Sequence, residues 1–234
     1  MKIKRDFYLI SLIVLIIIGF ILRFYKLSAQ SLWIDEGFSI NAATQTLKYF
    51  YPKLESGFVY SGSLLNTYLI AFFIKIFRDL VFGARFLSVI FGVLSIIITF
   101  YFGKEIYNKK IGLIAALFVT FSSIEIAWSR QARMYAQFQF FYLLSLYLFY
   151  RFINNKSLKY LILALIFTIA TILSNILGFS LILIYFIYFI LNYKDFKFIF
   201  TKKFLVPIFV FLIPIGYLII KNFWNYNYIY INYF

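Results

Sequence analysis

The feature that most constrains this chain is a succession of long apolar runs, separated by short segments that carry most of its charge. A helix that crosses a bilayer needs about 20 mostly apolar residues, and several of the runs approach that length. Because the runs are continuous and do not alternate in polarity, they favour helices over the strands of a lipid-facing barrel. Hydrophobic residues make up 64% of the chain, against about 45–50% in a soluble domain. The sequence therefore predicts an all-α polytopic membrane protein.

Seven of the runs are expected to span the membrane and to form one module over residues 1–234. A further run, Leu64–Phe77, is short enough to be an interfacial or re-entrant helix. We place it in a helical first outer loop over residues 27–84. The expected spans are Phe7–Leu22, Phe86–Phe102, Ile111–Trp128, Phe138–Phe149, Tyr160–Leu173, Ile176–Leu191 and Phe204–Ile220.

The positive charges set the expected orientation, because cytoplasmic loops carry an excess of Lys and Arg. Basic residues before the first run place the N-terminus in the cytoplasm. If Leu64–Phe77 does not span, the loops around Lys109, Lys159 and Lys203 are cytoplasmic too; if it spans, all three lie outside. We therefore prefer the first arrangement. The net charge of +15 fits loops beside membrane lipids, and nucleic acid is not expected as a partner.

The chain contains neither cysteine nor histidine. This excludes disulfides, thiolate or imidazole metal sites, and catalysis by histidine. Any acid–base chemistry must rest on carboxylates, lysine or tyrosine. No cofactor is expected, and no residue pattern indicates a divalent metal ion, although carboxylates alone could bind one.

Asp35 and Glu36 form an adjacent acid pair directly after the first apolar run, in a chain with eight acids in total. A carboxylate at the end of a membrane span is energetically unfavourable unless it pairs with a cation or contacts a substrate. Two interpretations are open. The pair caps the helix that follows, where negative charge favours the helix dipole. Alternatively, one acid is a general base near neutral pH, with a pKa raised by its neighbour.

Arginines are the second polar feature on the expected outer face. Arg130 and Arg133 lie three positions apart, so they share one side of a helix. Arg85 opens a span on the same face. Guanidinium groups bind phosphate in a bidentate manner, but each of these residues could equally be an interfacial anchor. Because cations are normally scarce on this face, arginines opposite an acid pair favour an anionic lipid headgroup as ligand, with Tyr135 beside it.

Three blocks of the sequence resemble one enzyme family. They are Ser-Leu-Trp-Ile-Asp-Glu at residues 31–36, Ala-Arg-Phe-Leu-Ser-Val-Ile-Phe-Gly-Val at 84–93, and Ser-Arg-Gln-Ala-Arg-Met-Tyr-Ala at 129–136. They are similar, in this order, to segments of the dolichyl-phosphate-mannose–protein mannosyltransferase-like glycosyltransferases of the GT-C fold. Each block alone is weakly specific, whereas the three together are fairly specific over roughly residues 30–150.

The resemblance implies a sugar donor linked to polyprenyl phosphate, and inverting transfer to a protein or lipid acceptor outside the cytoplasm. It implies Asp35 as catalytic base, with Glu36 beside it, and no need for a bound metal. Arginines near a lipid phosphate would neutralise the charge that develops on the leaving group. The expected phosphate and substrate contacts are Arg85, Arg130, Arg133 and Tyr135.

Two departures from the family pattern leave alternatives open. Many relatives carry a His-Pro-Pro or similar block where this chain has Tyr60–Asn66. Typical relatives also have further spans and a soluble C-terminal portion. The alternatives are a non-catalytic membrane protein that binds or carries polyprenyl-linked sugars, and a truncated, inactive relative. The acid pair favours an enzyme, since a protein that only binds an anionic lipid gains nothing from nearby carboxylates.

Overall fold

The computed structural model describes residues 2–194, 197–214 and 216–217, and helices make up nearly all of its regular structure. No strand forms in this part of the chain; Lys53 and Val59 form an isolated antiparallel bridge. The prediction of an all-α fold is therefore confirmed for the described residues.

The helices follow one another with mostly short connections. They are α1 (Lys2–Phe24), α2 (Ile34–Tyr49), α3 (Leu64–Phe77), α4 (Leu80–Ile106), α5 (Lys109–Phe121), α6 (Ser123–Trp128), α7 (Tyr135–Asn155), α8 (Leu158–Ser174), the 3-10 helix η1 (Ile176–Phe179), α9 (Ser180–Leu191) and the 3-10 helix η2 (Lys197–Phe200). Residues 202–214 and 216–217 are helical as well.

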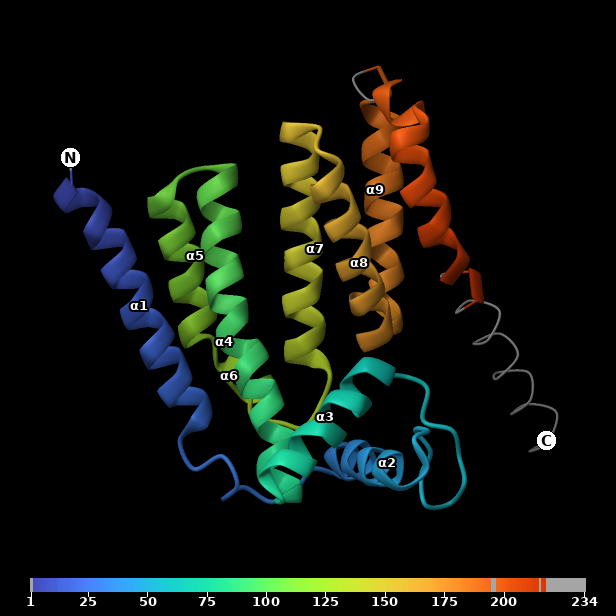
Figure 1. The fold of residues 1–234 in the computed structure, drawn as a ribbon. Coiled ribbons are helices and arrows are strands. Elements are labelled where there is room, and N and C mark those ends of the chain that lie inside the picture. The colour runs from blue at the N-terminus through green and yellow to red at the C-terminus, as the bar shows by residue number, and fades with distance from the viewer. Residues whose placement is uncertain (1, 195–196, 215, 218–234) are drawn as a thin grey trace.

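Figure 1 shows two kinds of helix. The long helices α1, α4, α5, α7, α8 and α9 stand upright as a bundle, whereas α2 and α3 lie across its lower end. Neighbouring upright helices run in opposite directions, so the connections alternate between the two ends of the bundle. The three blocks that carry the family resemblance all come to the end where α2 and α3 lie, which we call the α2–α3 end.

A core beneath the bundle fixes the crosswise helices in place. It joins Ile40 of α2, Ile70 of α3, Leu87 of α4 and Ala136 of α7, all of them buried. Burial of apolar side chains at a shared contact stabilises each helix against the others. The first turn of α2, which carries the acid pair, is therefore held at a fixed position relative to α4 and α7.

Two of the described helices are long and apolar enough to cross a membrane, over Phe7–Phe24 and Leu80–Ile106. The apolar helices Leu64–Phe77, Leu158–Ser174 and Ile176–Leu191 are shorter. The expectation of a multi-pass protein is thus met in part, and the other spans stay predictions.

The expected span Ile111–Trp128 is interrupted in the structure. α5 ends at Phe121, and Ser122 adopts an extended conformation (φ −61°, ψ 120°) before α6 begins. The hydroxyl of Ser122 accepts a hydrogen bond from the backbone N–H of Glu125 and so caps α6 (3.4 Å). Serine often bonds to the nearby backbone in this way, which competes with a continuous helix. The last expected span, Phe204–Ile220, lies partly outside the described residues.

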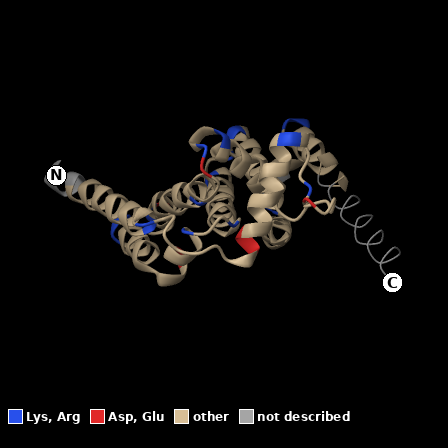
Figure 2. Ribbon diagram, turned by 90° about the horizontal axis from the view of Figure 1, so that it is seen from below, with Lys and Arg blue, Asp and Glu red and all other residues tan. Residues whose placement is uncertain are grey.

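Basic residues lie at both ends of the bundle. At the upper end, the turns from α4 to α5 and from α7 to α8 are flanked by lysines, namely Lys104, Lys109, Lys110, Lys156 and Lys159. The α2–α3 end carries lysines too, among them Lys48, Lys53 and Lys75. Figure 2 looks at the molecule from that end and shows few acidic positions among many basic ones. Asp35 and Glu36, in the first turn of α2, lie at the end opposite the lysines of the upper turns.

Candidate active site

The acid pair lies in the first turn of α2, which begins at Ile34 after an extended Trp33. Acids favour this position because the unpaired N–H groups of the first turn carry partial positive charge. Neighbouring residues on a helix point about 100° apart, so the two acids face different surroundings. The side chain of Glu36 is 1% exposed, whereas that of Asp35 is 36% exposed.

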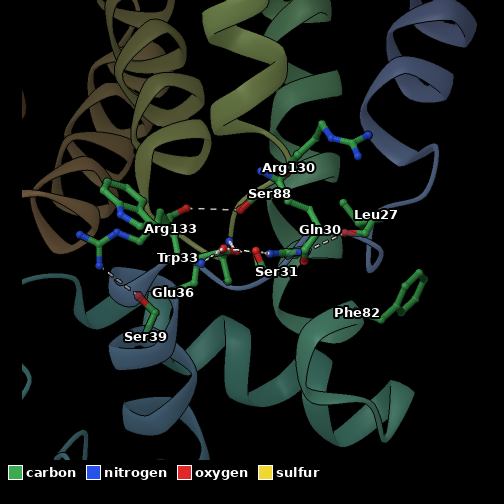
Figure 3. A network of polar contacts seen from close by, with 12 residues as sticks. Leu27, Gln30, Ser31, Trp33, Glu36, Ser39, Phe82, Ser88, Arg130 and Arg133 are labelled. Carbon is green, nitrogen blue, oxygen red and sulfur yellow. Dashed lines mark hydrogen bonds and ion pairs between the residues drawn. The ribbon is translucent and has the colours of Figure 1, made fainter.

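Glu36, labelled in Figure 3, forms a buried, bidentate ion pair with Arg85 of α4. Arg85 Nε lies 2.8 Å from Oε1, and Nη2 lies 2.9 Å from Oε2. The same carboxylate accepts the backbone N–H of Trp33 (3.0 Å) and of Ala132 (2.8 Å). Burial alone would raise the pKa of Glu36, but these donors, Arg85 foremost, outweigh it and hold the pKa below its ordinary value. Glu36 is thus an ionised link between α2, α4 and the segment before α7.

The remaining N–H groups of Arg85 hold the loop that leads from α1 to α2. Nη1 donates to the carbonyls of Leu27 (2.9 Å) and Gln30 (2.8 Å), and Nη2 donates to that of Ser31 (3.1 Å). All of the guanidinium donors are therefore engaged. In this arrangement the buried guanidinium has no donor left for a ligand, and the phosphate contact predicted for Arg85 stays a prediction.

Asp35 lies beside Arg133, whose Nη2 is 3.3 Å from Asp35 Oδ2. Arg133 Nη1 donates to the Asp35 carbonyl (3.2 Å), to Ser39 Oγ (3.2 Å) and to the Tyr60 hydroxyl (3.1 Å). Its Nε is buried and has no hydrogen-bond partner among the described residues. Burial lowers the pKa of Arg133, but Tyr60, Tyr135 and Asp35 outweigh this and raise the pKa above its ordinary value. A charged arginine with an unused donor thus adjoins a partly exposed carboxylate.

Tyr135 begins a row of aromatic rings that leads away from Arg133. The guanidinium carbon of Arg133 lies 5.7 Å from the centroid of the Tyr135 ring, within cation–π range. The Tyr135 ring packs on Trp128 (4.1 Å between centroids), and Trp128 packs on Trp33 (6.1 Å). The structure therefore brings Tyr135 to Arg133, and its role in substrate binding stays a prediction.

Arg130 is held apart from Asp35, and Figure 3 shows it and Arg133 extending to opposite sides of the view. Arg130 Nη1 donates to the carbonyls of Arg23 (3.3 Å) and Tyr25 (2.7 Å), at the end of α1. The last carbonyls of a helix lack partners within the helix, so a cation there is favourable. Arg23 of α1 makes a similar contact: its Nη2 donates to the carbonyl of Val119 (2.9 Å), near the end of α5. Arg130 thus caps a helix in this structure, and the phosphate contact predicted for it stays a prediction.

One face of α4 supports several of these contacts. Arg85, Ser88 and Gly92 are spaced three and four residues apart, so they lie on the same side of the helix. Ser88 Oγ donates to the carbonyl of Arg133 (3.3 Å). Gly92 leaves room for Ser129 and Arg23, because a Cβ atom at Gly92 would lie 2.6 Å from Ser129 Cβ and 2.9 Å from Arg23 Nε. The block at residues 84–93 therefore positions three separate segments around the acid pair.

Ser39 and Tyr60 belong to this group but were not singled out from the sequence. Ser39 follows Asp35 by four residues on a helix, a spacing that could have indicated it. Tyr60 comes from the loop before α3, and nothing distinguishes it among the 21 tyrosines of the chain.

The group combines two chemical abilities. A partly exposed carboxylate can accept a proton, and Arg133 with its neighbouring hydroxyl groups can hold an anion. Among the described residues, no three His, Cys, Asp or Glu side chains gather in a way that could hold a metal ion.

Comparison of the sequence with known proteins places the chain in a family. A family model described as dolichyl-phosphate-mannose-protein mannosyltransferase matches residues 61–220, which include Arg85, Arg130, Arg133 and Tyr135 but neither acid of the pair. An uncharacterized protein of Aquifex aeolicus (strain VF5) is 31% identical over 142 residues, which amount to 58% of this chain and 28% of that relative. The chain thus spans much less than the full length of that curated relative. Because the family match covers most of its length, the chain belongs to the dolichyl-phosphate-mannose-protein mannosyltransferase family.

Proposed function

We propose that this chain transfers a sugar from a polyprenyl-phosphate donor to a protein or lipid acceptor on the extracytoplasmic face of the membrane. Membership of the family points to a membrane glycosyltransferase in general. The observation that supports the finer proposal is the pairing of a partly exposed Asp35 with Arg133, whose Nε has no protein partner among the described residues. This pair offers a proton acceptor next to an anion-binding group.

In the proposed reaction, the donor phosphate binds to Arg133 and takes over the donors that now face Asp35. The freed Asp35 carboxylate then accepts the proton of the acceptor hydroxyl group. The acceptor oxygen bonds to the anomeric carbon as the bond from that carbon to the phosphate oxygen breaks. The electron pair of the broken bond leaves with the polyprenyl phosphate, whose growing charge Arg133 neutralises.

Other residues of the predicted site are assigned positioning roles. Glu36 and Arg85 are buried and saturated with hydrogen bonds, and they hold the loops around Asp35. Arg130 caps α1, and Tyr135 orients the Arg133 side chain through its ring. Asp35 and Arg133 are therefore the two residues proposed to contact the reacting groups.

The proposed topology is a single module of seven spans, with the N-terminus in the cytoplasm. The spans are α1, α4, α5, α7, α8, α9 and the helix that starts at residue 202. The crosswise position of α2 and α3 at one end of the bundle supports their assignment to an outer interface. Lysines at the opposite end favour a cytoplasmic location for that end, beside anionic membrane lipids.

A transfer assay tests the proposed chemistry. Membranes that contain the protein are incubated with a radiolabelled polyprenyl-phosphate sugar, for wild type, Asp35→Asn and a matched control, Glu55→Gln. Glu55 is an exposed acid in the loop after α2. We expect transfer by wild type and the control but not by Asp35→Asn, with equal amounts of inserted protein. Donor binding without turnover in wild type would instead indicate a non-catalytic binder.

Cysteine labelling tests the topology without background, because the chain has no cysteine of its own. Ser56→Cys places an exposed thiol at the α2–α3 end, and Asn155→Cys places one at the opposite end. A membrane-impermeant maleimide should label the first variant in intact cells and the second only after lysis. The reverse pattern would contradict the proposed orientation.

A further inference from the structure

Three buried polar side chains near the Asp35–Arg133 pair have atoms without a hydrogen-bond partner among the described residues. They are the hydroxyl of Ser63, both amide atoms of Asn66 and Oε1 of Gln137. Each of these side chains is 1% exposed. Burying a polar group without a partner costs stability, and most buried polar groups in folded proteins are satisfied. These unpaired atoms therefore point to a partner that the chain itself does not supply.

The three side chains lie at the starts of α3 and α7, two helices that share the buried cluster containing Ile70 and Ala136. Ser63 immediately precedes α3, Asn66 lies in its first turn, and Gln137 lies in the first turn of α7. The amide nitrogen of Gln137 donates to Ser174 Oγ at the end of α8 (2.8 Å), and α3 packs against α8. Figure 1 shows α3 passing beneath the lower ends of these upright helices.

The cluster is close in sequence to Arg133, the proposed phosphate contact, and to Tyr60, its hydrogen-bond partner. Tyr60 precedes Ser63 by three residues, and Arg133 precedes Gln137 by four. The Tyr60 hydroxyl and Arg133 Nη1 lie 3.1 Å apart, so this hydrogen bond joins the two segments that lead into α3 and α7. A phosphate bound to Arg133 would therefore lie next to the two segments that carry Ser63, Asn66 and Gln137.

We propose that Ser63, Asn66 and Gln137 form a carbohydrate subsite, which binds hydroxyl groups of a sugar whose phosphate is held by Arg133. This inference rests on the proposed function and adds residues that recognise the transferred group. An amide side chain offers both donors and acceptors, and so do sugar hydroxyl groups. A purely anionic ligand would leave the Asn66 amide oxygen unpaired, and an apolar ligand would leave both polar atoms of the amide unpaired.

Asn66→Leu is the main test, because leucine has a similar volume and removes the unpaired amide. The variant should unfold at the same temperature as wild type or higher, since no protein hydrogen bond is lost. Thr99→Val is the matched control: Thr99 Oγ1 is also buried and unpaired, but it lies in the last turns of α4, towards the opposite end. The two variants thus remove the same kind of defect at two places.

Binding of two lipids to the purified protein provides the readout. Wild type should bind mannosyl-phosphoryl-undecaprenol more tightly than undecaprenyl phosphate. In Asn66→Leu, this preference for the sugar should fall about ten-fold, the effect of losing one or two hydrogen bonds. The affinity for undecaprenyl phosphate should not change, and Thr99→Val should keep both affinities.

Different outcomes separate this inference from the proposed function. If Asn66→Leu keeps the wild-type preference for the sugar-bearing lipid, the unpaired atoms bind buried water molecules and the subsite is refuted. Equal affinity of wild type for the two lipids would refute it as well. If the preference is lost in Asn66→Leu but wild type transfers no sugar, the subsite is supported and the proposed catalysis fails.

Discussion

The Glu36–Arg85 and Asp35–Arg133 ion pairs start from neighbouring residues of α2, yet they differ in almost every physical property. Both side chains of the first pair are 1% exposed, whereas the exposed fractions are 11% for Arg133 and 36% for Asp35. Glu36 and Arg85 are saturated with hydrogen bonds, but Arg133 keeps a buried donor without a partner. The difference supports an anchoring role for the first pair and the proposed ligand contact for the second.

The physical reason lies in what each pair would lose by binding something else. A buried charge is tolerated only with a complete set of partners. A ligand that displaced Glu36 would leave the Arg85 charge buried and without its counter-ion. The Asp35–Arg133 contact is longer and partly solvated, so its exchange for a phosphate costs little. One turn of α2 therefore supplies both a fixed anchor and an exchangeable contact.

The largest expected effect comes from breaking the first pair. Glu36→Gln should lower the free energy of unfolding by about 3–5 kcal/mol, because it leaves the Arg85 charge buried and uncompensated. Unfolding of the purified protein in detergent, followed by helical circular dichroism, measures this. The double variant Glu36→Met/Arg85→Met should recover only part of the loss, because the loop carbonyls of Leu27, Gln30 and Ser31 lose their donors. Wild-type stability of the single variant would refute the anchoring role.

Removing the second arginine should act on function and spare the fold. Arg133→Met should reduce kcat/KM for the polyprenyl-phosphate sugar by about 10²–10³-fold, the usual effect of removing a group that stabilises developing negative charge. Arg133→Lys should restore part of it, since lysine keeps the charge but not the fork geometry. Steady-state kinetics in detergent provide the test. Unchanged kinetics in Arg133→Met would remove Arg133 from the reaction.

Arg130 offers a control from the same block of sequence. Arg130→Met should lower the free energy of unfolding by about 1 kcal/mol, because the end of α1 loses a favourable cation. Its kcat/KM, measured in the same assay, should remain within about two-fold of wild type. A loss of transfer as large as that in Arg133→Met would mean that both arginines bind the donor, as the sequence first suggested.

The pH dependence of stability should carry the smallest signal, and it comes from Glu36. Its pKa is lowered in the folded state from the ordinary value of 4.5, so the folded protein holds this proton less tightly than the unfolded chain. Its stabilising contribution is therefore complete above pH 4.5 and is lost as the pH falls through the folded-state pKa. Unfolding temperatures measured from pH 7 to pH 3 should fall less in Glu36→Gln than in wild type. Parallel curves would contradict the lowered pKa.

The sequence predicted the helical class of the fold and the group of polar residues at one end of it. Hydrophobic runs and charge spacing are local properties, so they indicated helices over most of α1, α4 and α8. They did not reveal the break at Ser122, because a serine within an apolar run is compatible with either a helix or a cap.

The sequence could not assign each arginine to its partner. The sequence does not distinguish the surroundings of Asp35 from those of Glu36. Neighbouring residues on a helix point about 100° apart, so the two side chains face different parts of the protein. The partners of Arg85 and Arg130 are mostly backbone carbonyls. Every residue has a backbone carbonyl, so the sequence does not indicate which of them an arginine contacts. Spacing alone therefore grouped Arg130 with Arg133, although the loop between α6 and α7 turns them apart.

The central claim, that neighbouring acids have separate roles, is tested most directly by comparing Asp35→Asn with Glu36→Gln in one experiment. Sugar transfer and unfolding temperature are measured on both purified variants and on wild type. We predict that Asp35→Asn loses about 10²–10⁴-fold in transfer at an unchanged unfolding temperature. Glu36→Gln should unfold at a clearly lower temperature. Wild-type turnover by Asp35→Asn, or an equal loss of stability in both variants, would contradict the account.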